Sequence, residues 1–168
     1  YLIRASVRLE NKSDKSLALP TQEIVVGTAT PMESDDRTFS YYGGAMWFDG
    51  KKPQDHPITY FSTNTTVLGF FHRTPTTEYI AGAGDVIWAA AHNQFFALLA
   101  MPQKPAPEIL ARPVMLPQFP DIKGITNAPL PEGVQTMLVY PAQTLTANSS
   151  VERQITIYAG PTEYSALA

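Results

Sequence analysis

Fifteen prolines are spread along the 168 residues, and their distribution limits the fold more than any other feature. An average chain of this length would hold about eight. Because a proline kinks or ends an α-helix, the segments between these prolines leave little room for long helices. The sequence therefore predicts a chain built mostly of short extended segments.

Both ends of the chain alternate between apolar and polar residues, which is typical of half-buried strands. Residues 1–9 carry apolar side chains at every odd position. Residues 150–159 follow the same rule, with Arg153 as the one misfit. The two segments are predicted to be strands that each present one face to a core.

Other segments have the β-branched and aromatic composition of strands. Residues 22–28 contain Ile-Val-Val, and the aromatic residues 39–48 end at Asp49-Gly50, a favoured hairpin dipeptide. Further strands are predicted at 58–61, 65–71, 108–116 and 133–140, whereas 51–57 and 117–131 are predicted to be loops. Pro113 lies inside one of these strands, which predicts an edge or a bulge at that point.

Residues 85–101 form the most apolar stretch and allow two interpretations. Alanine and leucine favour one helix through the whole stretch. Valine, isoleucine, tryptophan and the Phe95-Phe96 pair favour two buried strands, with the polar break at His92, Asn93 and Gln94 as the turn between them. We expect the two strands. The whole pattern then predicts an all-β class with little helix, a sandwich of antiparallel strands in one domain over 1–168.

Charge and composition exclude several classes of function. Twelve Lys and Arg against fifteen Asp and Glu give a net charge of −3, which offers no general basic surface, so no nucleic acid partner is expected. The absence of cysteine excludes disulfides, thiolate metal sites and cysteine nucleophiles. No apolar run reaches the ~20 residues of a membrane span. The first residue is Tyr1 and no targeting signal opens the chain, so a piece of a longer protein is expected.

Residues that could carry chemistry are scattered. His56, His72 and His92 lie far apart in the sequence, which argues against a metal centre. The acidic group Glu33, Asp35 and Asp36 lacks the spacing of a calcium loop and is expected to be a solvated loop. No cofactor is expected. The aromatic residues around Trp47 and Trp88 suit a core better than a sugar-binding face.

Two segments resemble a known family. The stretch from Trp88 through Asn93, Phe95 and Phe96 is similar to a Trp-x-x-x-x-Asn-x-Phe-Phe-Ala motif in the periplasmic domain of the YidC family of bacterial membrane protein insertases. The segment with Gly160, Pro161 and Tyr164 is similar to the Gly-Pro-Lys-Glu-Tyr motif with which that domain ends, with Thr162 in place of lysine. The end of the first strand, Glu10-Asn11-Lys12-Ser13, is similar to an Asn-x-Ser strand end in the same domain.

The resemblance implies a β-supersandwich of the galactose-mutarotase type. It also implies a place on the periplasmic side of the bacterial inner membrane, in a polytopic protein that inserts and folds membrane proteins. Implied partners are nascent membrane proteins, the Sec translocon and SecDF, and the membrane through anchor helices outside this sequence. Domains of this family are longer, so an N-terminal portion is expected to be missing or shortened, and 160–168 to begin the linker toward the membrane-embedded core.

No catalytic residue follows from the resemblance, and the domain is expected to be an interaction module without enzymatic activity. Trp88, Asn93, Phe95 and Phe96 are interpreted as packing and turn residues, and Gly160-Pro161 as the exit toward the membrane. Two alternative functions remain open. His92 with the following Phe pair is superficially similar to a strand of aldose epimerases, although no histidine follows it to complete an acid/base pair. The second alternative is a generic sugar- or peptide-binding module, which takes an extended segment at a sheet edge.

Overall fold

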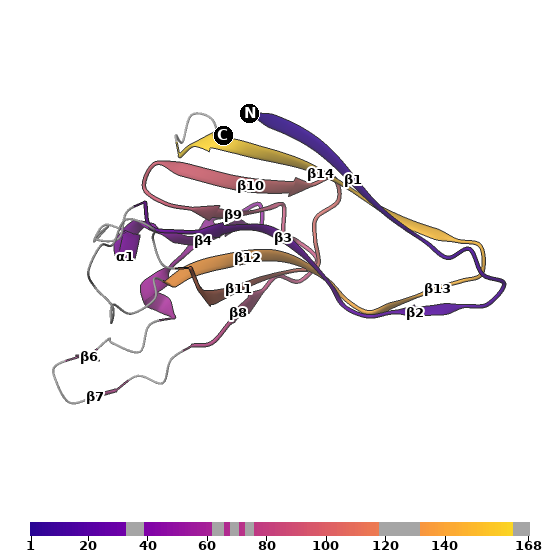
Figure 1. Cartoon of the computed structure of the whole chain (residues 1–168), viewed down its shortest axis with the longest axis horizontal. Coiled ribbons are helices and arrows are strands. Elements are labelled where there is room, and N and C mark those ends of the chain that lie inside the picture. Colours follow the sequence, from indigo (N-terminus) through magenta and orange to yellow (C-terminus); the bar gives the residue numbers. More distant parts are fainter. Residues whose placement is uncertain (33–38, 62–65, 68–70, 73–75, 118–131, 163–168) are drawn as a thin grey trace.

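Antiparallel strands make up most of the protein. The computed structural model describes residues 1–32, 39–61, 66–67, 71–72, 76–117 and 132–162. Two large sheets pack face to face in the broad body of the molecule, and a narrow lobe projects from one side (Figure 1). The prediction of an all-β sandwich with little helix is confirmed.

The larger sheet has six strands in the order β1-β14-β10-β9-β4-β5. Every neighbouring pair in it is antiparallel. The strands are β1 (Leu2–Glu10), β14 (Ser150–Pro161), β10 (Phe96–Pro102), β9 (Trp88–His92), β4 (Gly44–Phe48) and β5 (Pro53–Pro57). The two ends of the chain thus supply neighbouring strands, with β1 along the outer edge (Figure 1).

The second sheet has four strands in the order β3-β12-β11-β8, and these pairs are also antiparallel. The strands are β3 (Gln22–Ala29), β12 (Glu132–Tyr140), β11 (Glu108–Met115) and β8 (Tyr79–Ala81). This sheet lies over β9, β10 and β4 of the larger one. It stops at β3, so β1 extends beyond its cover.

Short elements complete the described part of the chain. The lobe contains β2 (Leu17–Leu19) paired with β13 (Gln143–Leu145), and β6 (Thr66–Val67) pairs with β7 (Phe71–His72). The helices are α1 (Phe39–Tyr42) and the 3-10 turn η1 (Ile58–Tyr60). Neither of these two described helices is long enough to cross a membrane.

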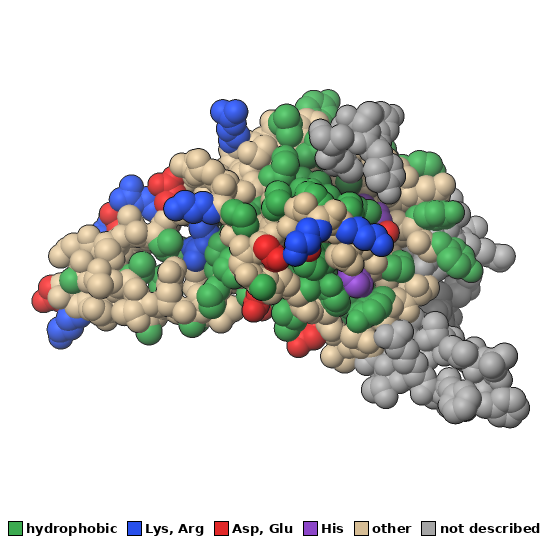
Figure 2. All heavy atoms as spheres, turned by 180° about the vertical axis from the view of Figure 1, so that it is seen from behind, with side chains coloured by type: hydrophobic (Ala, Val, Ile, Leu, Met, Phe, Trp, Pro, Cys, Tyr) green, Lys and Arg blue, Asp and Glu red, His purple; other side chains and the backbone are tan. Residues whose placement is uncertain are grey.

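Side chains from both sheets form the core. Ile109 and Leu138 of the second sheet are fully buried against Trp47, Ala89 and Ile155 of the larger one. A second cluster around Val134 packs at the end of the sandwich near η1. Hydrophobic side chains also reach the surface over the broad body of the molecule (Figure 2).

Several predicted strands are confirmed by the structure. The end segments form β1 and β14, and residues 22–28 and 133–140 fall in β3 and β12. The apolar stretch 85–101 forms two strands rather than one helix, because β9 and β10 pair as a hairpin around Asn93–Phe95. Pro113 pairs with Val134 of β12, but β8 pairs only with residues 109–111 on the other side of β11, so the proline lies at a free edge of that strand among the described residues, as predicted.

Three local predictions were wrong. The aromatic segment 39–48 was grouped with the strands, but Phe39–Tyr42 form the helix α1 and only Gly44–Phe48 form a strand, β4. Residues 51–57 were expected to be a loop, but Pro53–Pro57 form β5. An edge position explains this, because prolines at the ends of an edge strand remove no ladder bond from the sheet interior. Residues 58–61 were expected to be a strand, but the amide of Phe61 donates to the carbonyl of Ile58 at 3.0 Å in a 3-10 turn. This turn puts side chains three apart on one side, so both residues are buried together.

The remaining predictions on strands and loops fall partly on residues outside the described ranges. These are the acidic group at 33–36, most of the predicted strand 65–71 and most of the loop 117–131.

Candidate interaction sites

Asn93 organises the turn between β9 and β10. Its side-chain carbonyl oxygen accepts hydrogen bonds from the amides of Phe95 at 2.9 Å and Phe96 at 2.8 Å. An asparagine that bonds amides two and three residues ahead fixes a tight turn. The structure therefore places Asn93 where the predicted role in turn geometry requires it.

The aromatic residues of the same motif are less buried than the predicted packing role implies. Trp88 is half-buried and stacks on Phe48, with ring centres 5.8 Å apart. Phe95 and Phe96 are 54% and 52% exposed. They lie at the end of the β9–β10 hairpin, where Phe95 is in the turn and Phe96 begins β10. Of the two tryptophans, Trp47 is the one in the core.

The second motif continues the sheet further than predicted. Gly160 and Pro161 still belong to β14 and pair with Ala97 and Phe96. The hydroxyl of Tyr158 donates to the carbonyl of Pro161 at 2.8 Å and lies over Gly160, where a Cβ atom would come within 2.6 Å of it. Gly160 thus makes room for this ring. Tyr164 lies outside the described residues.

His92 is buried and is paired with a carboxylate two strands away. Its Nε2 lies 3.0 Å from Oδ1 of Asp55, although β4 runs between β9 and β5. The contact ties three strands of the larger sheet together. It was not foreseen from the sequence, because the two residues lie 37 positions apart.

His56 lies on the opposite face of the same sheet edge, among aromatic rings. Its ring centre is 3.8 Å from that of Tyr79 and 5.1 Å from that of Tyr60. Burial lowers the pKa of His56 below its ordinary value of 6.5, while the nearby Asp55 carboxylate acts in the opposite direction. A neutral imidazole in an aromatic cluster suits a core role better than proton transfer.

Metal-ligating side chains do not gather within the described ranges, where no group of three or more His, Asp or Glu is found. Of the histidines, His92 and His56 point to opposite faces of the sheet, and the side chain of His72 lies outside the description.

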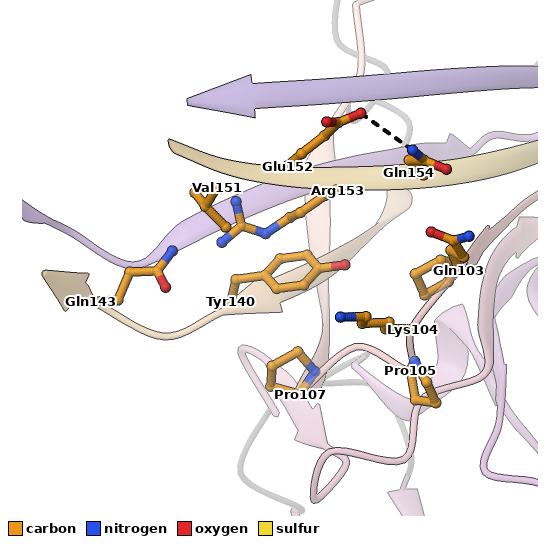
Figure 3. A pocket seen from close by; sticks show the side chains of 11 residues that line it. Gln103, Lys104, Pro105, Pro107, Tyr140, Gln143, Val151, Glu152, Arg153 and Gln154 are labelled. Carbon is orange, nitrogen blue, oxygen red and sulfur yellow. Dashed lines mark hydrogen bonds between the residues drawn. The ribbon is translucent and has the colours of Figure 1, made fainter. Parts of the chain in front are cut away.

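A pocket of about 440 Å³ opens where the loop after β10 passes the beginning of β14 (Figure 3). Arg153 and Tyr140 form one wall, and the guanidinium carbon lies 4.2 Å from the centre of the ring. Arg153 also donates to Oε1 of Gln22 at 2.7 Å. Lys104 reaches toward the same ring from the loop, beside Pro105 and Pro107 (Figure 3).

The charges around this pocket are arranged asymmetrically. Glu152 also lines it, but its carboxylate accepts hydrogen bonds from Ser6 at 2.6 Å and Gln154 at 3.3 Å, and these bonds lower its pKa. Neighbouring residues of a strand point to opposite faces, so this carboxylate and Arg153 diverge. Burial raises the pKa of Tyr140, so its hydroxyl stays protonated beside the guanidinium. The pocket therefore suits a ligand with an apolar body and a carboxylate or other hydrogen-bond acceptor.

Sequence reasoning missed this site, although one signal pointed to it. Arg153 was the only charged residue on the apolar face of its strand. The structure explains the misfit, because its guanidinium stacks on the ring of Tyr140, the last residue of β12 (Figure 3).

A sandwich of antiparallel strands with an open pocket between loop and sheet is the class of protein that the fold and the site define. The family model described as the YidC periplasmic domain matches residues 1–168, and the chain therefore belongs to this family. It is a domain of the kind found in membrane protein insertases, as the sequence motifs predict. A search of curated proteins found no match.

Proposed function

We propose that this domain is a non-catalytic interaction module of a membrane protein insertase on the periplasmic face of the inner membrane. The family match over residues 1–168 is the observation that carries the proposal. The proposed partners are the Sec translocon, SecDF and segments of nascent membrane proteins. The pocket around Arg153 and Tyr140 supports a docking role, since it offers apolar surface and hydrogen-bond donors together.

A binding measurement tests this role. The purified domain is immobilised by one end, and detergent-solubilised SecDF is passed over it in biolayer interferometry. We expect saturable binding that Arg153→Ala weakens at least threefold and that the exposed control Lys51→Ala leaves unchanged. Equal signals on the domain and on an unrelated periplasmic β-sandwich of similar net charge would overturn the proposed partnership.

An aldose epimerase is the second candidate, and the contact between His92 and Asp55 is the observation that favours it. A histidine hydrogen-bonded to a carboxylate is a common acid/base arrangement. His92 is buried, however, and the contact also serves to join three strands. A polarimetric mutarotase assay with several aldoses should show no rate above buffer. Turnover that His92→Ala abolishes would establish the epimerase instead.

A further inference from the structure

Two cations of the pocket in Figure 3 lack an acidic partner within the described part of the chain. Arg153 and Lys104 both line the pocket, and neither makes an ion pair with any residue that the structure describes. Glu152 also lines it, but its carboxylate accepts hydrogen bonds from Ser6 and Gln154. Uncompensated cations beside a low-dielectric wall raise the local concentration of anions. The pocket therefore attracts a negative group, although the chain as a whole carries a net charge of −3.

The guanidinium of Arg153 is held in place before any ligand binds. It lies 4.2 Å from the centre of the Tyr140 ring and donates to Oε1 of Gln22 at 2.7 Å. This hydrogen bond engages only one terminal nitrogen, Nη2. Because a guanidinium presents five N–H donors in a rigid fork, the remaining donors can bind both oxygens of a carboxylate. Preorganisation of this kind reduces the entropy that is lost on binding.

A buried donor without a partner belongs to the same pocket. Gln143 lines it, and Nε2 of this side chain is buried and makes no hydrogen bond with any residue in the described ranges. Nearly all buried donors in proteins have a partner, because leaving one unpaired is costly. An acceptor that enters the pocket would supply the missing partner.

The remaining walls suit an organic ligand better than a compact inorganic anion. Three prolines of the segment 102–107 line the pocket together with the ring of Tyr140. These rings offer apolar contact to an aromatic or aliphatic group next to the bound anion. Burial raises the pKa of Tyr140, so its hydroxyl stays protonated and does not repel an anion. At about 440 Å³ the pocket is larger than a carboxyl group requires and lies within the usual range of ligand sites.

We propose that this pocket binds an acidic side chain of a partner polypeptide, with the carboxylate held between Arg153 and Lys104. An aromatic or aliphatic neighbour of the acidic residue packs against Tyr140 and the prolines. A side-chain carboxylate fits better than a C-terminal one, because C-terminal carboxylates are captured by backbone N–H groups, whereas the donors here are side chains. This inference rests on the proposed interaction role and names the chemistry that the pocket recognises.

A designed peptide tests the pocket directly. Acetyl-Lys-Gly-Ser-Phe-Glu-Phe-Ser-Gly-amide carries one glutamate between two phenylalanines, and fluorescence anisotropy with a label at the lysine measures its binding to the domain. We expect saturable binding, and at least tenfold weaker binding of the peptide with glutamine in place of glutamate. The peptide with serine in place of both phenylalanines should bind at least threefold more weakly. A glutamine peptide that binds as tightly as the glutamate peptide would overturn the proposal.

Two charge reversals separate the pocket from a general effect of charge. Lys104 and Lys51 are both exposed, so Lys104→Glu and Lys51→Glu change the net charge equally and should leave the fold intact. We expect Lys104→Glu to weaken binding of the glutamate peptide at least tenfold and Lys51→Glu to leave it within twofold. Equal effects of the two variants would overturn the site.

Arg153→Lys tests the role of the guanidinium fork. Lysine keeps the positive charge but offers neither the fork nor the planar stack on Tyr140. We expect at least fivefold weaker binding of the glutamate peptide, with circular dichroism and thermal unfolding as the check that the variant is folded. A folded Arg153→Lys domain that binds this peptide as tightly as the unchanged domain would refute the role assigned to the arginine.

Competition distinguishes the other anions that two cations could hold. Inorganic phosphate and sodium chloride at equal ionic strength should displace the glutamate peptide equally, and stronger displacement by phosphate would assign the pocket to phosphate groups and overturn the proposal. A peptide whose only carboxylate is C-terminal, with glutamine in place of glutamate, should bind at least tenfold more weakly than the glutamate peptide. Tighter binding of that peptide would overturn the choice of a side chain.

The binding measurement with SecDF separates this inference from the proposed function. Absence of peptide binding in a domain that still binds SecDF would overturn the assignment of the pocket alone. Peptide binding that Lys104→Glu weakens, in a domain that does not bind SecDF, would support the pocket and overturn the proposed partner alone.

Discussion

The side-chain amide of Asn11 donates a hydrogen bond of 3.1 Å to the carbonyl of Leu145, which joins the end of β1 to the end of β13. The same amide nitrogen lies 2.8 Å from the carbonyl of Lys15 and 2.9 Å from that of Thr146. The side-chain oxygen accepts bonds from the amide and the hydroxyl of Ser13. Asn11 is 1% exposed, so one buried side chain holds together the outer end of the lobe, where β1 ends, β2 begins and β13 ends.

Replacing this side chain should be costly because several buried backbone groups lose their partner at once. We expect Asn11→Ala to lower the free energy of unfolding by about 2–3 kcal/mol, the range for leaving buried polar groups unsatisfied. Urea denaturation followed by tryptophan fluorescence measures it. The exposed neighbour Lys12→Ala is the control and should change little. A loss for Asn11→Ala no larger than that of the control would refute the anchoring role.

The two tryptophans should respond differently to truncation. Trp47 is buried between the sheets and its indole nitrogen donates to the hydroxyl of Tyr79 at 3.2 Å, so Trp47→Ala should cost about 3–5 kcal/mol. Trp88 is half-buried against Phe48, and Trp88→Ala should cost less than half as much. Chemical denaturation of both variants checks the order. Equal losses would mean that the stack with Phe48 contributes as much as the core position.

The titration of His56 should make the domain less stable in mild acid. Its pKa is lowered by burial from the ordinary value of 6.5, so the unfolded chain binds the proton more readily than the folded one. The stability that the neutral His56 contributes is then fully present above pH 6.5 and is lost as the pH falls through the pKa of the folded state. Denaturation between pH 8 and pH 5 should show this decline, and His56→Phe should flatten it.

Glu152→Gln serves as the control for the acid experiment. The pKa of Glu152 is also lowered from its ordinary value of 4.5, first by the hydrogen bond from Ser6, so its contribution is lost only at lower pH. The variant should therefore leave the slope above pH 5 unchanged. An unaltered slope in His56→Phe would show that other groups cause the decline.

Much of the fold could be predicted from the sequence because it depends on local patterns. Alternation in the end segments predicted β1 and β14, and the polar break at 92–94 predicted the hairpin between β9 and β10. The predictions failed where tertiary position overrides local preference. Pro53 and Pro57 read as loop residues, but the free edge of a sheet accepts them.

The candidate sites could not be predicted in the same way, because their residues meet only through long-range pairing. Arg153 donates a hydrogen bond to Gln22, which is 131 positions away in the sequence, and His92 contacts Asp55, which is 37 positions away. The family motif, in contrast, could be recognised, since the turn at Asn93 is a short-range feature.

Gly44 gives the most direct test of how closely β4 and β5 approach. A Cβ atom at this position would lie 2.2 Å from the carbonyl oxygen of His56 and 2.7 Å from the Cα of Pro57. Both neighbours are backbone atoms, which cannot rotate away, so the strands themselves would have to separate. We expect Gly44→Ala to cost about 3 kcal/mol, the upper end of the usual range for overpacking, and to expose the aromatic cluster around His56.

Gly84→Ala separates this steric effect from the conformational one. Gly84 has φ +84°, a left-handed conformation, but no atom lies within 4 Å of its missing Cβ. Its replacement should cost about 1–2 kcal/mol, the penalty for a left-handed residue with a side chain. Denaturation and near-ultraviolet circular dichroism of both variants test the comparison. Separation of β4 and β5 would disturb the rings around His56 and so change the aromatic signal. If Gly44→Ala costs no more than Gly84→Ala and leaves this signal unchanged, the two strands are not packed as tightly as their pairing indicates.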